Sequence, residues 1–280
     1  MLNPLSVLKH PVLLSLYFIS SWSNAQTYSS SSSAAIAGAG RAAVEASDVN
    51  YLNPAALVHA KGRYIYSTWS SEDLSVGLSE TSEDVIIPAN LSYFQRKTKE
   101  GATEIRVDEI RLSIANFVVS KFAMGLTAIS NTSKVNDIGY NQTNANIGFF
   151  YTPNDHFGLA YVFYNTFEPP WNVPEVLQLR PQMAIGMNTV FKNIVRGRFD
   201  VLSAAGNNFG KPSYLGGFEA ILNQWLSLRF GYKNDILAEQ EVFTQGIGFN
   251  GPTFALNYAH QGAVKGKDFE RHSIDLLISF

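Results

Sequence analysis

Five histidines give this chain its widest choice of chemistry, because imidazole can bind metals, move protons and activate nucleophiles. They are His10, His59, His156, His260 and His272. His260 and His272 flank the last connecting segment and can approach each other, but the sequence shows no convincing further ligand, and zinc sites use at least three protein ligands. Ser273 follows His272, yet neighbours on a strand point to opposite faces, which argues against a nucleophile–base pair. We therefore expect no metal site and no catalytic residue.

Composition excludes several other classes of site. The chain of 280 residues has no cysteine, which excludes thiol catalysis, disulfides and cysteine-bound metal centres. It contains neither a GxSxG elbow nor a glycine-rich phosphate loop, so we expect no cofactor. A net charge of −2 offers no basic field for nucleic acid.

Four charged residues share a pattern of their own. Arg198, Asp200, Glu219 and Arg229 fall on three consecutive apolar-alternating runs, each on the face opposite the apolar row. On the lipid face of a membrane barrel a charge costs about 2–4 kcal/mol at the midplane, so these side chains are expected to face the lumen. The favoured interpretation is an internal ion-pair ladder that stiffens the wall, since opposite charges on neighbouring strands can pair. A substrate site is the alternative.

The elements that must position these charges are strands. From Arg63 onward, runs rich in aromatic and β-branched residues alternate with turn residues. In the clearest run, 225–233, four apolar residues fall on one face: Leu226, Leu228, Phe230 and Tyr232. We predict about 14 strands, with 12 as an alternative, near 63–69, 74–81, 84–96, 105–118, 121–130, 139–152, 157–167, 182–192, 196–204, 213–222, 225–233, 241–249, 252–261 and 270–280.

Connector length separates a membrane barrel from a soluble sandwich, which produces the same alternation. From the third strand onward, short connectors such as 153–156 and 223–224 alternate with longer ones such as 98–104, 131–138 and 168–181. Short turns at one end and long loops at the other are typical of outer-membrane barrels. Charged residues make up only 16% of the chain, against about 25% in soluble domains. We therefore predict a transmembrane antiparallel β-barrel that is closed by a last strand ending at Phe280.

The N-terminus has the pattern of a secretory signal. Lys9 precedes an apolar run that starts at Pro11, and Ser23-Asn24-Ala25 is a small-x-small cleavage site. The run is shorter than the ~20 residues of a spanning helix. We divide the chain into a signal peptide (1–25), a serine-rich leader with a small-residue segment (26–62), and the barrel (63–280).

Two regions resemble a known group of proteins. Gly38-Ala-Gly-Arg-Ala42, Ala46-Ser-Asp48 and Asn53-Pro-Ala55 are similar to the N-terminus of the FadL/TodX outer-membrane hydrocarbon transporters and of their distant relatives, the PorV-like type IX secretion barrels. The C-terminal hairpins, with Gly217-Phe-Glu219 and Leu226 to Tyr232, resemble the same group. The matching stretches cover about a quarter of the chain, and their motifs are moderately specific.

The resemblance implies a 14-stranded barrel whose N-terminal segment folds inside the lumen as a hatch. The candidate hatch and gating residues are Gly38, Gly40, Arg41, Asp48, Asn53 and Pro54. Arg41 either pairs with a lumen carboxylate such as Glu219 or is a solvated turn arginine. Asn53-Pro54 is a turn starter before the first strand and more structural than ligand-binding. A barrel of this size has a lumen that must be filled or used, because about eight strands are already filled by side chains.

The resemblance implies a function in the bacterial outer membrane: passive uptake of hydrophobic small molecules such as fatty acids or hydrocarbons. The alternative is a structural or docking barrel for protein secretion or surface attachment, and an outer-membrane enzyme is a weaker one. The expected partners are outer-membrane lipids, a hydrophobic ligand, the barrel-assembly machinery and, for the docking alternative, a secretion partner.

Overall fold

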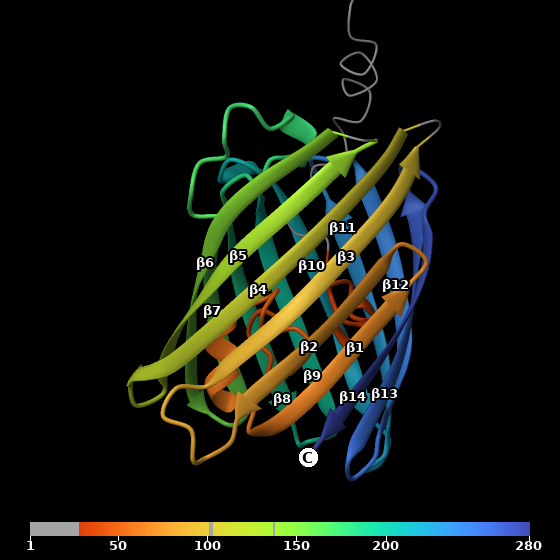
Figure 1. The fold of residues 1–280 in the computed structure, drawn as a ribbon. Helices are drawn as coiled ribbons and strands as arrows, with labels where there is room; N and C mark the ends of the chain where they lie inside the picture. Colours follow the sequence, from red (N-terminus) through yellow and green to blue (C-terminus); the bar gives the residue numbers. More distant parts are fainter. Residues whose placement is uncertain (1–27, 101–102, 137) are drawn as a thin grey trace, which may run out of the picture.

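The fold is a single antiparallel sheet that closes on itself, as the tilted ribbons of Figure 1 show. The computed structural model describes residues 28–100, 103–136 and 138–280, so the expected signal peptide lies outside the described residues. Each strand pairs with its sequence neighbours, and β1 pairs with β14 to close the barrel. The prediction of a closed antiparallel barrel of 14 strands is confirmed, and the alternative of 12 is wrong.

The strand bounds follow the expected alternation closely. The strands are β1 (Gly62–Ser70), β2 (Asp73–Thr81), β3 (Ala89–Glu100), β4 (Thr103–Val119), β5 (Phe122–Val135), β6 (Ile138–Asn154), β7 (Phe157–Tyr164), β8 (Gln182–Phe191), β9 (Val195–Ala204), β10 (Asn208–Ile221), β11 (Leu226–Asp235), β12 (Gln240–Asn250), β13 (Phe254–Lys265) and β14 (Glu270–Ser279).

Side chains alternate between an apolar outer face and a mainly polar or small inner face. On β5, Leu126 is exposed while Ala123 and Thr127 are buried inside. On β11, Tyr232 is exposed whereas Ser227 and Arg229 are buried. Exposed apolar residues on so many strands need a nonaqueous surrounding, which is the pattern of a membrane-spanning barrel.

The expected long loops at 98–104 and 131–138 are wrong. β3 and β4 stay paired to Glu100 and Thr103, and β5 and β6 stay paired to Val135 and Ile138. β4 and β6 have 17 residues each, beyond the ~9–11 that cross a bilayer. Outside the bilayer the backbone ladder continues without an apolar row, so the polar sequence there was misread as loop.

Other boundaries also differ from the prediction. β3 begins at Ala89 instead of residue 84, directly after Pro88, whose nitrogen cannot donate to a ladder. The expected connector 205–212 is shorter, because β10 begins at Asn208 with a register shift before Ser213. A long connector does follow β7, over residues 165–181, and includes η3 (Glu175–Leu177).

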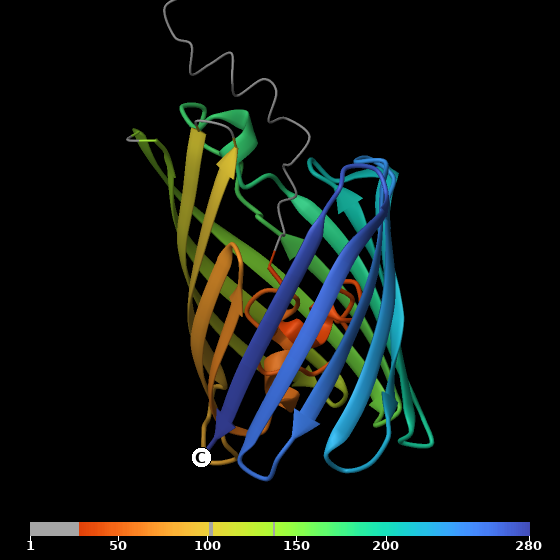
Figure 2. The same cartoon turned by 90° about the vertical axis from the view of Figure 1, so that its right-hand side faces the viewer.

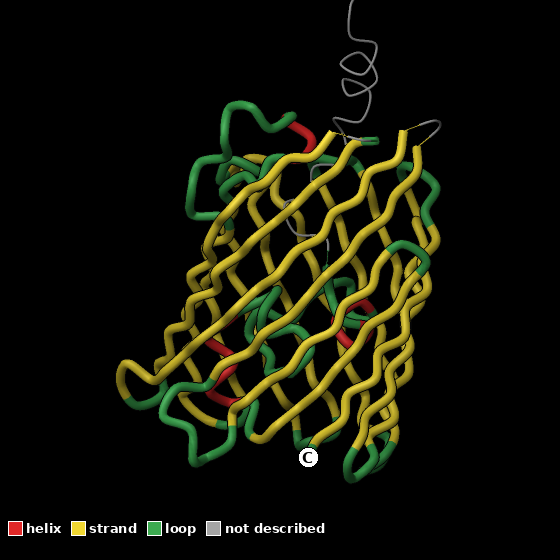
Figure 3. The backbone as a smooth tube through the Cα atoms, in the orientation of Figure 1, coloured by secondary structure: helices red, strands yellow, loops and turns green. Residues whose placement is uncertain are grey.

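Helical structure is sparse in the described residues, as the red pieces in Figure 3 show. α2 (Ser31–Ala34) and η2 (Pro54–His59) lie in the segment before β1. No helix in the described part of the chain is long and apolar enough to cross a membrane.

The seam between the first and last strands is a regular ladder. Seven residue pairs join β1 to β14, from Tyr64–Ser279 to Ser70–Ser273. Phe280 follows β14, and its backbone nitrogen donates to the carbonyl oxygen of Arg63 at 3.2 Å. The candidate closure residue therefore extends the seam, with its side chain exposed. We call the end of the barrel that holds Phe280 the C-terminal rim and the other end the opposite rim (Figure 1).

Candidate functional site

The centre of the barrel is occupied by the chain's own residues 28–60, named here the N-terminal segment. Figure 2 shows this red-to-orange segment within the wall of strands. Most of its side chains are buried, including those of Ile36, Arg41, Tyr51 and Leu57. Its small residues allow the compact turns around α2 and η2 that a lumen of this width accommodates. Whether the segment works as a hatch depends on how it is held.

One attachment is an ion pair between Arg41 and Asp200 of β9. Arg41 Nη1 lies 2.9 Å from Asp200 Oδ2, and both side chains are buried. The same carboxylate oxygen accepts hydrogen bonds from the backbone nitrogens of Gly40 at 2.8 Å and Arg41 at 3.1 Å. The alternative of a solvated turn arginine is wrong, and so is the suggested partner Glu219. Asp200 is the residue that faces the turn.

The two candidate glycines serve this turn. Gly38 has a φ of +81°, a left-handed conformation that favours glycine, and its carbonyl oxygen accepts a hydrogen bond from Arg41 Nη1 at 3.3 Å. A Cβ at Gly40 would lie 2.9 Å from both the Leu52 and Ser33 side chains. Both glycines therefore let the chain fold tightly enough to present Arg41 to the wall.

A second attachment joins Glu45 to the charged wall residues. Arg198 contacts the Glu45 carboxylate, and Arg196 Nη1 lies 3.4 Å from it. Burial alone raises the pKa of Glu45, but the guanidinium groups of Arg198 and Arg196 outweigh it and lower that pKa below its ordinary value. Glu45 was missed in the sequence because it stands alone in an alanine-rich stretch with no strand periodicity.

The charged wall residues next to Glu45 also contact one another. Glu219 lies 2.7 Å from Arg229, 3.1 Å from Arg196 and 3.8 Å from Arg198. Three of the four candidate ladder residues are therefore brought together, while Asp200 contacts Arg41 instead. Arg196 was also missed. Because the cluster includes Glu45, it links the wall to the N-terminal segment as well as strand to strand.

Asp48 forms the third polar centre, inside the N-terminal segment. Its carboxylate accepts hydrogen bonds from the Ser30 nitrogen at 2.7 Å, the Ser30 hydroxyl at 2.7 Å and the Ser33 hydroxyl at 2.5 Å. Burial raises the pKa of Asp48, and the serine hydrogen bonds oppose that rise only in part. The serine-rich tract thus supplies buried donors, a role that its composition did not indicate.

Asn53 and Pro54 close the segment near the C-terminal rim. Asn53 is the N-cap of η2, accepting from the Ala55 nitrogen at 3.0 Å, and its amide donates to the carbonyl oxygen of Arg41 at 2.9 Å. Pro54 occupies the first turn of η2, where a missing N–H is tolerated. Both residues therefore shape the turn that leads into η2.

Glycines on the wall let the N-terminal segment approach the strands closely. A Cβ at Gly125 of β5 would lie 2.4 Å from the Ala55 nitrogen, and one at Gly231 of β11 would lie 2.5 Å from the Ile36 carbonyl carbon. Gly246 of β12 is equally close to the Ala35 side chain, at 2.5 Å. Any side chain at these positions forces the segment or the wall to move.

Apolar side chains fill the space between these polar attachments. Ile36 and Ala39 of the segment pack with Val162, Leu202 and Leu215 of the wall. A second cluster groups Val49, Ala55 and Leu57 with Phe150. The segment and the wall therefore share two apolar interfaces.

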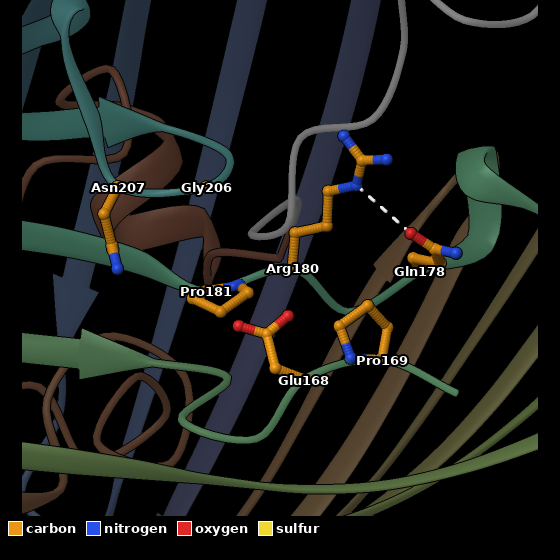
Figure 4. Close-up of a pocket in the computed structure, with 7 residues that line it drawn as sticks. All are labelled: Glu168, Pro169, Gln178, Arg180, Pro181, Gly206 and Asn207. Atoms are coloured by element: carbon orange, nitrogen blue, oxygen red, sulfur yellow. Dashed lines mark hydrogen bonds between the residues drawn. The ribbon is translucent and has the colours of Figure 1, made fainter. Parts of the chain in front are cut away.

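A cavity of about 300 Å³ lies at the opposite rim, between the 165–181 connector and the turn after β9. Its lining is mixed and mostly polar (Figure 4), and the Arg180 Nε donates to the Gln178 side-chain oxygen at 3.3 Å. The lining residues are Glu168, Pro169, Gln178, Arg180, Pro181, Gly206 and Asn207. This polar cavity is distinct from the apolar clusters deeper in the barrel.

Comparison with solved structures finds this fold in hydrocarbon channels. The CymD monoaromatic hydrocarbon channel aligns with a TM-score of 0.69 and 11% identity, covering 89% of this chain and 96% of that one. The Pseudomonas putida toluene transporter TodX gives 0.67 and 11%, covering 91% and 97%. A Pseudomonas aeruginosa FadL homologue gives 0.65 and 10%, covering 90% and 98%. The resemblance to the FadL/TodX group is confirmed as a likeness of fold.

The sequence itself is distant from characterised proteins. No protein-family model matches the chain, and no curated protein matches it.

Proposed function

We propose that the protein is a passive channel of the bacterial outer membrane that admits hydrophobic small molecules. The observation that carries the proposal is the closed barrel whose lumen holds its own N-terminal segment, in a fold shared with the CymD and TodX hydrocarbon channels across 89% and 91% of this chain. The outward apolar side chains support the membrane location.

The attachments of the N-terminal segment support a gating role. It is held against the wall by ion pairs at Arg41 and Glu45, by further hydrogen bonds such as that from the Ala37 nitrogen to Thr244, and by apolar packing between residues such as Ile36 and Leu215. An apolar ligand that takes over part of this packing shifts the segment toward an open arrangement. The shift requires only that the ligand binds the open arrangement more tightly than the closed one. Flux then follows the concentration gradient without an energy source.

Uptake by cells tests the proposal. A strain lacking the gene is complemented with wild type or with an empty vector, and uptake of radiolabelled toluene and of a long-chain fatty acid is measured at low concentration. We expect wild type to increase the initial uptake of at least one of them severalfold over the vector. Equal uptake of both compounds in the two strains, at matched outer-membrane levels, would contradict the proposal.

The docking alternative also has one observation in its favour. Trp171, in the connector 165–181, is 94% exposed, and nearby Phe167 is 57% exposed. Exposed aromatic residues are frequent anchors of protein interfaces. A Trp171→Ala, Phe167→Ala double variant that loses surface attachment or secretion of a cargo while keeping hydrophobe uptake would assign this connector to docking.

The enzyme alternative gains no support from His272 and Ser273, the possible base and nucleophile that are neighbours in the sequence. Ser273 is buried on the inner face, whereas the side chain of His272 is 57% exposed on the outer face. The two side chains thus point away from each other, as neighbours on a strand do.

A further inference from the structure

Three potential metal ligands converge on the outer face of the β13–β14 hairpin near the opposite rim. His260 and His272 form a direct cross-strand pair, and Glu270 lies one step away on the same face. The imidazole nitrogens and one carboxylate oxygen all lie within 4.8 Å of one another. The sequence drew attention to the two histidines, and the structure adds Glu270 as a third ligand.

The two distances from the carboxylate to the imidazoles fit tetrahedral coordination. In a zinc site with bonds of about 2.0–2.1 Å, neighbouring ligand atoms lie roughly 3.3 Å apart. Glu270 Oε1 lies 3.2 Å from His260 Nε2 and 3.4 Å from His272 Nε2. One carboxylate oxygen thus stands at the required separation from both imidazole nitrogens before any ion is bound.

A hydrogen bond from a neighbouring side chain orients one of the two imidazoles. Tyr258 Oη lies 2.8 Å from His272 Nδ1, the nitrogen opposite the one that faces Glu270. Metal-bound histidines regularly use their second nitrogen for such a hydrogen bond, which fixes the ring and its tautomer. In the tautomer whose Nδ1–H donates to the phenol oxygen, Nε2 of His272 has a free lone pair for a cation.

We propose that His260, Glu270 and His272 bind a divalent transition-metal ion, with zinc as the best fit to the ligand set and spacing. Two imidazoles and a carboxylate suit zinc. Glu270 directly follows the connector 266–269 at the opposite rim, so the exposed side of the cluster leaves a fourth position open to water or to an external ligand. The site lies on the wall outside the lumen, so it is independent of the proposed channel.

Calorimetric titration of zinc into tag-free, detergent-folded barrel tests this site. We expect one zinc per wild-type barrel. His260→Ala, His272→Ala and Glu270→Gln should each weaken binding by more than about tenfold, and Tyr258→Phe by about tenfold. His156→Ala changes an exposed turn histidine far along the chain and should leave the affinity unchanged.

Two readouts keep the result unambiguous. Gel migration before and after boiling verifies that each variant is folded, and Co²⁺ reports coordination through the strong visible absorption of a tetrahedral site. Absence of zinc binding to the folded wild type overturns the proposal, as does equal weakening by His156→Ala. If the three ligand variants bind zinc as wild type does, the cluster is only a hydrogen-bonded surface group and the proposal is wrong.

Discussion

Arg41 in the N-terminal segment and Asp200 in the barrel wall form a buried ion pair, with 2.9 Å between Nη1 and Oδ2. The pair joins residues far apart in sequence, and the Asp200 carboxylate also receives the backbone N–H groups of Gly40 and Arg41. Such a contact favours one position of the N-terminal segment, because moving the segment away from the wall would leave a buried charge without its partner. The first prediction concerns this pair.

Asp200→Asn removes the wall charge and leaves the buried guanidinium of Arg41 without its counterion. Breaking a buried pair by removing one partner costs about 3–5 kcal/mol, so we expect a large loss in the free energy of unfolding or release of the segment. Leakage of a small hydrophilic antibiotic into cells should rise. Arg41→Ala should act in the same direction but less strongly, because the Gly40 and Arg41 backbone donors remain.

The matched control is an ion pair at the surface. Arg63 and Glu80 lie 2.6 Å apart with half-exposed side chains, and exposed pairs contribute about 0–1 kcal/mol. Arg63→Ala should therefore leave leakage at the wild-type level. If Asp200→Asn leaks no more than Arg63→Ala, the buried pair does not hold the segment.

The second prediction uses the glycines that line the wall. Gly125→Ala places a Cβ 2.4 Å from the Ala55 nitrogen, so the segment must shift, and we expect greater leakage and faster protease cleavage after Lys61. Gly139→Ala makes the same chemical change on β6, where a Cβ meets nothing within 4 Å. Equal behaviour of the two alanine variants would show that close packing at β5 is unimportant.

The third prediction is a pH dependence that originates in Asp48. Burial raises the pKa of Asp48 above its ordinary 3.8, so the folded protein holds this proton more tightly than the unfolded chain does. The resulting destabilisation is complete above the folded pKa, decreases as the pH falls through it, and is gone below the ordinary value of 3.8. Thermal stability should therefore rise, through this group, as the pH falls from above the raised pKa towards the ordinary 3.8.

Glu45 acts in the opposite sense at lower pH. Its pKa is lowered, so its stabilisation is present above the ordinary value of 4.5 and is lost as the pH falls through the lowered value.

The contribution of Asp48 is measured as the difference in Tm between wild type and Asp48→Asn at each pH. We expect the variant to lack the rise on mild acidification, while the exposed substitution Asp155→Asn keeps it. An unchanged pH profile in Asp48→Asn would contradict this assignment.

The fourth prediction concerns closure of the barrel. Deleting Phe280 removes the backbone donor to the Arg63 carbonyl and the terminal aromatic residue that resembles a barrel-assembly signal. We expect reduced levels of heat-modifiable protein in the outer membrane, with Phe280→Tyr near wild type. Normal assembly of the deletion variant would show that the ladder between β1 and β14 is sufficient.

The sequence predicted the strands because period-2 alternation separates outer from inner side chains, and the alternation of short and long connectors favoured a membrane barrel over a sandwich. The prediction failed where the strands extend beyond the membrane and their outer side chains no longer need to be apolar. Lys97, Thr98 and Lys99 show no apolar alternation, yet their backbone stays paired with β4. The extended hairpins near the opposite rim were therefore read as loops. Likewise, Glu270 was not recognised as a possible ligand, because its proximity to His260 arises from strand register.

The contacts of the N-terminal segment were less accessible to sequence analysis. Strand alternation correctly predicted that Asp200 and Glu219 face the lumen. Nothing in the sequence says which of the two carboxylates contacts Arg41, because the N-terminal segment has no periodicity. Glu45 and Ser30 gained their roles only when the segment folded against Arg198 and around Asp48. The tertiary contacts of an irregular segment depend on the full course of its backbone, which local sequence patterns do not indicate.

Flux through purified protein in liposomes is the most direct test of the proposed channel. Vesicles with and without the barrel receive toluene or a long-chain fatty acid outside and contain a reporter inside, with no ion gradient or nucleotide. We predict that wild type accelerates entry of a hydrophobic compound while a small sugar stays excluded, and that Gly125→Ala admits the sugar. Hydrophobe entry at the rate of protein-free vesicles, with correctly folded barrel present, would contradict the account.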